Sequence, residues 1–306
     1  MSVEELIKAA GIHAAVSDKN TGRLVINRDK VVDSNVIPGL VIDAKEIKDG
    51  VDINFILKEN TIIENPVHLC FGVTDKKAIQ KIIMNVDIRK NSKISLIAHC
   101  VFPNAVDVKH IMDAKVKIGK GSKYSYFERH IHNEEGGIEV IPKAYIELEE
   151  NSRFKTEFEL LKGRVGTIDI DYEITCGKAS VMEMTTRING RGNDTINIKE
   201  SGNLVGERSR GVLTSKIAVR ESAKANIFNR MIATGDYARG HVDCKEIIQD
   251  NAVAKAIPIV EVRNPKAHIT HEASIGSVDS KQLQTLMSRG LSEDESVELI
   301  ISGLLS

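Results

Sequence analysis

The sequence predicts a mainly β protein with a parallel β-helix core, a short helical and β region before it, and a two-helix domain after it. Two observations support this prediction. From about residue 85, one pattern recurs: an apolar residue, a tight polar turn and an alternating strand. After residue 276 the patterning becomes helical. Repeats of about 20–30 residues with no room for a helix are typical of stacked solenoid coils.

Each repeat begins at an apolar or small anchor residue that precedes a polar turn. The anchors are Ile88, Ile118, Leu148, Thr175, Ile198 (a degenerate copy), Val219 and Ile248, separated by 30, 30, 27, 23, 21 and 29 residues. The strands that follow alternate with period two, as in Ile94, Leu96 and Ala98, which indicates strand rather than helix. A β-sandwich is the alternative. The recurring Asn-Ser-Lys/Arg turn favours the β-helix, in which each coil covers its neighbour's edge.

The two ends of the chain carry helix signals. Residues 2–10 form an amphipathic stretch that Ser2 can cap and Gly11 can end. Near the C-terminus, two capping-box patterns begin at Asp279 and Ser292, and each is followed by apolar positions at helical spacing. We therefore divide the chain into an N-terminal region (1–84), a β-helix core (85–276) and a helical domain (277–306). The helical pair either caps the last coil or forms a docking surface for a partner.

Composition excludes several classes of protein. With 42 Lys+Arg against 43 Asp+Glu, the chain has no basic excess for binding nucleic acid. It has no apolar run long enough to span a membrane, and its acidic N-terminus does not resemble a signal peptide. We therefore expect a cytoplasmic protein. The four cysteines are too sparse for a disulfide scaffold and too far apart for a zinc clip.

Residues 241–276 contain the strongest candidate metal ligands: Cys244 and, 27 residues later, His271 and Glu272. Thiolate, imidazole and carboxylate groups are common ligands of transition metals. Their separation is too long for a local clip, but it is close to one coil. In a β-helix, residues one coil apart lie about 5 Å from each other, so Cys244 and His271 are expected on neighbouring coils, facing the same way.

The other cysteines and histidines give weaker signals. Cys100, which is near His110 along the chain, is either a sulfur relay or a buried structural thiol. Cys70 and Cys176 have no associated motif, and we interpret them as structural or incidental. His130 and His132 resemble a metal clip, but the acidic, glycine-containing segment that follows favours a solvated turn.

Several segments resemble the SufB/SufD family of iron–sulfur cluster assembly proteins. They are the strand that contains Cys244, the segment PIVEVRNPKAHITHEASIG, and the ending QLQTLMSRGLSEDESVELIISG. Upstream, SLIAHCVFP resembles the family's Gly-Cys-x-x-Pro segment, with Cys100 at its cysteine. The resemblance runs from about residue 85 to residue 303. The presence of Cys244 together with His271-Glu272 is similar to the SufB type, in a short form like the minimal archaeal version.

The resemblance implies a right-handed parallel β-helix, which pairs with a second copy as a homodimer near Cys244 and His271. It implies an ABC-type ATPase docked on residues 277–306, with a sulfur donor and apo-protein acceptors as further partners. Cys244, His271 and Glu272 take the positions of ligands to a transient iron–sulfur cluster. Cys100 takes a position linked to sulfur transfer, and His110 a position inside the helix.

Two other functions remain as alternatives. One is a SufD-type partner that does not itself hold the cluster, and the other is a polysaccharide-active β-helix enzyme. The enzyme is disfavoured by the missing signal peptide and by the C-terminal helices. No segment resembles the phosphate-binding loop G-x-x-x-x-G-K-[ST], so ATPase activity is expected in a partner, and the chain itself is expected to be a scaffold rather than an enzyme.

Overall fold

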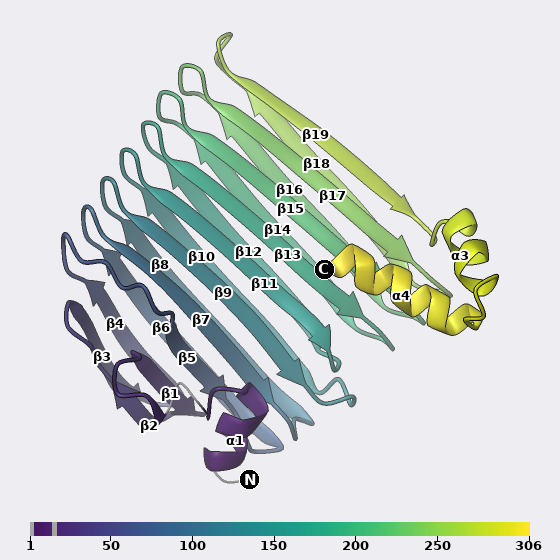
Figure 1. The fold of residues 1–306 in the computed structure, drawn as a ribbon, viewed down its shortest axis with the longest axis horizontal. Helices are drawn as coiled ribbons and strands as arrows, with labels where there is room; N and C mark the ends of the chain where they lie inside the picture. The colour runs from purple at the N-terminus through teal and green to yellow at the C-terminus, as the bar shows by residue number, and fades with distance from the viewer. Residues whose placement is uncertain (1–2, 14–16) are drawn as a thin grey trace.

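The chain folds into a parallel β-solenoid of two facing sheets, with helices at both ends (Figure 1). The computed structural model describes residues 3–13 and 17–306. Each coil contributes one strand to each sheet, and the strand pairs are parallel from β4 and β5 onward. The β-helix prediction is therefore confirmed, and the β-sandwich alternative is wrong. Parallel pairing begins upstream of residue 85, where we expected the core to start.

Odd-numbered strands form most of one sheet and even-numbered strands most of the other. The first sheet contains, in spatial order, β19 (His268–Gly276), β17 (Arg239–Ile248), β15 (Arg210–Val219), β13 (Val181–Gly190), β11 (Arg153–Lys162), β9 (Lys123–His132), β7 (Lys93–Phe102), β5 (Val67–Gly72), β1 (Arg23–Asn27) and β2 (Lys30–Asn35). The second contains β18 (Val253–Val262), β16 (Lys224–Ala233), β14 (Thr195–Leu204), β12 (Gly166–Cys176), β10 (Ile138–Leu148), β8 (Asp107–Ile118), β6 (Lys77–Ile88), β4 (Gly50–Leu57) and β3 (Leu40–Ile47).

The beginning of the solenoid is closed by antiparallel hairpins and one helix. β2 pairs antiparallel with β1, and β3 with β4. Helix α1 (Val3–Ala10) ends at Gly11, whose positive φ of 71° glycine adopts without a steric penalty. The predicted cap at Ser2 lies outside the described residues. Leu6 of α1 is buried in one cluster with Val25, Cys70 and Val101, so α1 covers apolar surface at this end of the solenoid.

The coil length is more regular than the sequence repeat indicated. Cys176 pairs with Leu204 in one sheet, a step of 28 residues, whereas Val219 pairs with Ile248 in the other sheet, a step of 29. The predicted steps of 23 and 21 residues around Ile198 are therefore wrong. Each coil has two polar turns of similar sequence, one leading into each sheet. The anchors up to Thr175 lie in the even-numbered sheet, whereas Val219 and Ile248 lie in the odd-numbered sheet.

The recurring turn has a structural role. Asn91 and Asn151 adopt positive φ values of 54° and 57°, a conformation that asparagine tolerates better than most residues. The serines that follow them, Ser92 and Ser152, are buried. The hydroxyl group of Ser92 donates to the backbone carbonyl of Lys58 on the preceding coil at 2.7 Å. This bond satisfies a backbone group that the turn would otherwise bury without a partner.

The C-terminal helices confirm the predicted pair. Helix α3 (Ser280–Met287) is capped by the side chain of Asp279, and helix α4 (Glu293–Leu305) by a capping box between Ser292 and Glu295. Ile301 and Leu305 of α4 are buried against Ala218, so α4 is anchored to the odd-numbered sheet (Figure 1). Helix α3 has no buried residue.

The far end of the solenoid is open. β18 and β19 are the edge strands of their sheets, and their residues are exposed or only partly buried. Uncovered edge strands present unpaired N–H and C=O groups that can pair with another chain. Among the described residues, no helix is long and apolar enough to cross a membrane.

Candidate functional site

Cys244 lies at the centre of β17, one coil before the open end. Its side chain is fully buried and points into the space between the sheets. The side-chain amide of Asn229 donates to its sulfur at 3.6 Å, and Ser215 is its register partner on β15. Burial raises the pKa of the Cys244 thiol, and hydrogen bonds from Ser215 and Asn229 oppose that rise. The site thus contains polar groups that can stabilise a thiolate.

His271 shares a face with Cys244, and Glu272 does not. His271 is the register partner of the buried residue Val242, and Cys244 is the partner of Ala273. Because side chains alternate between the faces of a strand, His271 lies on the inward face, two positions along from Cys244. Glu272 pairs with Asp243 and lies on the opposite face of β19. His271 and Glu272 are both exposed because β19 is an edge strand.

More polar side chains line the interior beside Cys244. Glu246 and Glu200 are almost completely buried, and burial raises the pKa of each carboxyl to about 7. Thr186 donates a hydrogen bond to Glu200 Oε1 at 2.6 Å. Ser215 Oγ lies 3.5 Å from Glu246 Oε1. This end of the interior is therefore polar, in contrast to the apolar packing that fills most of the solenoid.

A second polar cluster lies in the interior nearer the N-terminus, around Cys100 on β7. Cys100 Sγ is 3.6 Å from Glu128 Oε1 and 3.9 Å from His110 Nε2. Glu128 Oε1 is 2.8 Å from His130 Nε2, and His130 Nδ1 is 3.1 Å from His132 Nε2. Potential ligand atoms of Cys100, Glu128 and His130 all lie within 4.8 Å of one another. We call Cys100, His110, Glu128, His130 and His132 the Cys100 cluster.

The backbone register explains why these residues meet. Cys100 on β7 is paired with His130 on β9, and Glu128 lies two positions before His130 on the same inward face. His110 comes from β8 in the opposite sheet. Cys100 and His110, which are ten residues apart in the sequence, therefore meet across the interior of the solenoid.

The ionisable groups of the Cys100 cluster are shifted by burial. Burial, followed by the nearby Glu128 carboxylate, raises the pKa of the Cys100 thiol well above its ordinary value. Burial lowers the pKa of His110 to about 3 and that of His132 well below its ordinary value. Burial also raises the pKa of Glu128, but the hydrogen bond and charge of His130 outweigh this, and the net shift is downward. His110 and His132 are therefore held as neutral imidazoles beside the Glu128 carboxylate.

The interpretation of His130 and His132 as a solvated turn is wrong. Both lie in strand β9 and are buried, with exposed fractions of 1% and 7%. Sequence reasoning also missed Glu128, which lacked a motif. The available signal was alternation: Tyr124, Tyr126, Glu128, His130 and His132 occupy every second position of one strand. The solvated segment begins only after this strand ends.

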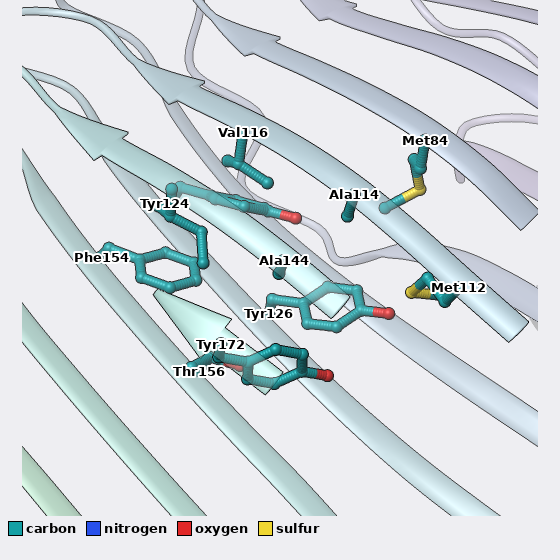
Figure 2. Close-up of a pocket in the computed structure, with 11 residues that line it drawn as sticks. Met84, Met112, Ala114, Val116, Tyr124, Tyr126, Ala144, Phe154, Thr156 and Tyr172 are labelled. Carbon is teal, nitrogen blue, oxygen red and sulfur yellow. The ribbon is translucent and has the colours of Figure 1, made fainter. Parts of the chain in front are cut away.

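A small cavity lies along the same inward face of β9. It has a volume of about 30 Å³, enough for a water molecule, and Tyr124 and Tyr126 form part of its wall (Figure 2). Tyr172 of β12 and two methionines, Met84 and Met112, complete much of the lining. Figure 2 shows the side chains of Tyr126 and Tyr172 lying side by side, with their hydroxyl groups pointing the same way. The interior is therefore less tightly filled here.

Comparison with known proteins identifies similar chains. A family model described as "SUF system FeS cluster assembly, SufBD core domain" matches residues 72–304. An iron–sulfur cluster assembly SufBD family protein of Methanocaldococcus jannaschii is 38% identical over 92% of this chain and 90% of its own. A SufBD family protein of Pyrococcus horikoshii is 36% identical over 98% and 92%. The SufB protein of Bacillus subtilis is 39% identical over only 22% of this chain and 15% of its own.

Proposed function

Because the chain belongs to the SufBD family of iron–sulfur cluster assembly proteins, we propose that it is a scaffold subunit. Clusters would be assembled on it and transferred from it to apo-proteins in the cytoplasm, with an ABC-type ATPase as its partner. The observation that supports this most is the position of Cys244 and His271, which share the inward face at the open end of the solenoid. The cluster is cargo rather than a permanent cofactor.

The scaffold works as a homodimer through the open end. At the open end, each chain supplies one cysteine, Cys244, which is too few to hold a cluster. Two copies related by a two-fold axis provide two thiolates from Cys244 and two imidazoles from His271. The uncovered strands β18 and β19 supply the edges that such pairing needs. Mixed ligation of this kind is weaker than four thiolates and suits a scaffold that must release its cargo.

Glu272 is proposed as a third ligand, supplied across the dimer interface. On its own strand it lies on the face opposite to Cys244, beside Asp243 and Lys245. Lys245 already forms an ion pair with Asp243 at 3.0 Å. Glu272 is exposed, so its carboxylate is free to reach a cluster held between two copies.

The C-terminal helices form the proposed ATPase-docking site. A groove of about 370 Å³ between α3 and α4 is lined by Leu286, Leu299 and Ile300 together with polar residues. Leu299 has an exposed fraction of 51%, unusual for a large apolar side chain. Since α4 is anchored to β15 through Ala218, movement of the docked ATPase would be transmitted to the sheet that contains Cys244.

Cys100 and His110 form the proposed sulfur-transfer site. Their 3.9 Å contact places the His110 imidazole beside the Cys100 thiol. In the proposed step, the Cys100 sulfur attacks the outer sulfur of a donor persulfide, the donor's S–S bond breaks, and the donor leaves as a thiol that takes up the Cys100 proton. Because Cys100 is completely buried, the donor reaches it only when the solenoid opens locally.

Anaerobic reconstitution tests the scaffold function. The purified chain, with iron, sulfide and reductant, is expected to bind iron and sulfide in equal amounts and to pass them to an apo-ferredoxin. A SufD-type partner would remain colourless under the same conditions. A colourless preparation that still forms a complex with the ATPase would therefore overturn the scaffold proposal in favour of that alternative.

A further inference from the structure

We propose that the Cys100 cluster binds one divalent transition-metal ion, Zn²⁺ or Fe²⁺, through Cys100, Glu128, His130 and His110. This site is separate from Cys244. Cys100 and Cys244 lie in β7 and β17 of the same sheet, five strands apart, which corresponds to about 24 Å at the usual strand spacing. The inference does not rest on the proposed scaffold function.

The donor atoms have the spacing that one ion requires. Tetrahedral Zn²⁺ holds sulfur at about 2.3 Å and nitrogen or oxygen at about 2.1 Å, which places sulfur about 3.6 Å from the other ligand atoms. Cys100 Sγ lies 3.6 Å from Glu128 Oε1 and 3.9 Å from His110 Nε2. Glu128 Oε1 and His130 Nε2 are 2.8 Å apart, so this pair would separate by about 0.6 Å when an ion enters between them.

Hydrogen bonds orient His130 to bind a cation. A backbone carbonyl only accepts, so His132 Nδ1 donates to Arg164 O at 3.2 Å and leaves Nε2 of neutral His132 as an acceptor. His130 Nδ1 therefore donates to His132 Nε2. The remaining nitrogen, His130 Nε2, then faces the Glu128 carboxylate, and two such groups at 2.8 Å need a proton or a metal ion between them.

His110 is oriented in the same manner by Gln80. The Gln80 side-chain amide donates to the carbonyls of Arg28 and Gly72 at 2.9 and 3.1 Å, which fixes its oxygen toward His110. His110 Nδ1 consequently donates to Gln80 Oε1 at 2.9 Å, and its Nε2 lone pair points to Cys100 Sγ. A ring nitrogen that donates to a fixed acceptor is the usual arrangement behind a metal-binding histidine.

Charge balance also favours a dication. Glu128 has an exposed fraction of 1%, and its Oε2 has no hydrogen-bond partner among the described residues. No lysine or arginine of the described chain is among the buried residues. A thiolate, a carboxylate and neutral imidazoles around a dication sum to zero charge, which removes most of the cost of burying the carboxylate. A bound dication would thus explain why Glu128 Oε2 is buried without a hydrogen-bond partner among the described residues.

Metal binding and sulfur transfer compete for the same thiol. A coordinated Cys100 is held as a thiolate on the ion and is blocked from accepting sulfur. The metal-loaded protein is therefore expected to form less persulfide at Cys100 than the metal-free protein. Comparing persulfide formation in the metal-loaded and metal-free protein separates metal binding from sulfur transfer at Cys100, because either proposal can fail without the other.

Cobalt(II) provides the test, because it substitutes for Zn²⁺ and absorbs visible light. The full-length chain is stripped with chelator, unfolded, refolded with one equivalent of Co²⁺ and passed through a desalting column. Refolding ensures that the ion reaches the interior. We expect one Co²⁺ per chain, with tetrahedral visible bands and a thiolate-to-cobalt charge-transfer band. Zn²⁺ added in place of Co²⁺ should raise the melting temperature.

Variants locate the ion. Cys100→Ser should remove the charge-transfer band, and Glu128→Gln and His130→Gln should each weaken retention of Co²⁺ at least tenfold. Cys176→Ser, which changes another buried thiol, and Cys244→Ser should retain the full spectrum. Circular dichroism of each refolded variant excludes loss through misfolding. Absence of retained Co²⁺ in the folded wild type, or a charge-transfer band lost in Cys244→Ser but kept in Cys100→Ser, would overturn the proposal.

Discussion

His271 lies directly opposite Val242 on the neighbouring coil, so its imidazole is on the inward face that also carries Cys244. The offset between His271 and Cys244 is two positions, about 7 Å along the strand. Glu272 occupies the next position and therefore the other face. His271 and Glu272 are thus expected to contribute differently to the proposed cluster site, His271 from the face of Cys244 and Glu272 from the opposite face.

Alanine substitutions can separate these contributions. His271→Ala removes an imidazole on the face of Cys244 and is expected to lower cluster retention about tenfold or more, a loss typical of metal-site residues. Glu272→Ala is expected to have its main effect in the dimer, where we propose the carboxylate reaches the cluster. Iron retention measured on dilute and concentrated protein tests this, and an effect of Glu272→Ala that is the same at both concentrations would contradict the cross-interface role.

The two faces of α4 should respond differently to truncation. Ile301 has an exposed fraction of 1%, whereas Leu299 has 51%. Ile301→Ala is expected to loosen α4 from the sheet at a cost of about 2–4 kcal/mol. Leu299→Ala should leave folding unchanged but weaken binding of the ATPase. Hydrogen exchange of α4 and a pull-down with the ATPase measure the two effects, and equal ATPase binding by Leu299→Ala and wild type would contradict the docking assignment.

Glu200 should make the fold less stable as the pH rises. Its pKa is raised from 4.5 to about 7 in the folded chain. Its contribution to the free energy of unfolding is therefore fully present below pH 4.5 and is lost as the pH rises through 7. Replacing it with glutamine removes this loss. From pH 4 to pH 8, the free energy of unfolding of Glu200→Gln should therefore rise by on the order of 3 kcal/mol relative to that of the wild type.

Urea unfolding of both proteins at the two pH values tests the role of Glu200. Thr186, whose hydroxyl bonds to Glu200, provides a control: Thr186→Val changes the hydrogen bond but retains the titrating group. An identical stability difference between Glu200→Gln and wild type at pH 4 and pH 8 would show that the carboxyl does not titrate as described.

The fold was predictable because period-two alternation and a repeated turn are local properties of the chain. Anchors such as Ile88, Ile118 and Leu148 are true register partners in the structure. The later anchors were not predictable, since Val219 belongs to the other sheet and only the three-dimensional register distinguishes the two series of turns.

The sites were predictable only in part, for a related reason. Spacing of about one coil indicated that Cys244 and His271 face the same way, but the true register of 29 residues makes Ala273 the partner of Cys244. Glu128 was missed because a single glutamate in a strand has no motif. Its role depends on burial between two sheets, and one sequence does not reveal which face of a strand is closed.

Cluster loading of Cys244→Ser tests the central claim most directly. Wild type, Cys244→Ser and the control Cys176→Ser are reconstituted anaerobically, and iron and sulfide are measured per chain together with the absorption spectrum and the oligomeric state. We expect stoichiometric iron and sulfide in wild type and Cys176→Ser, and neither in Cys244→Ser, with the dimer unchanged in all three. Unchanged iron and sulfide in Cys244→Ser would contradict the assignment of the open end as the site of cluster assembly.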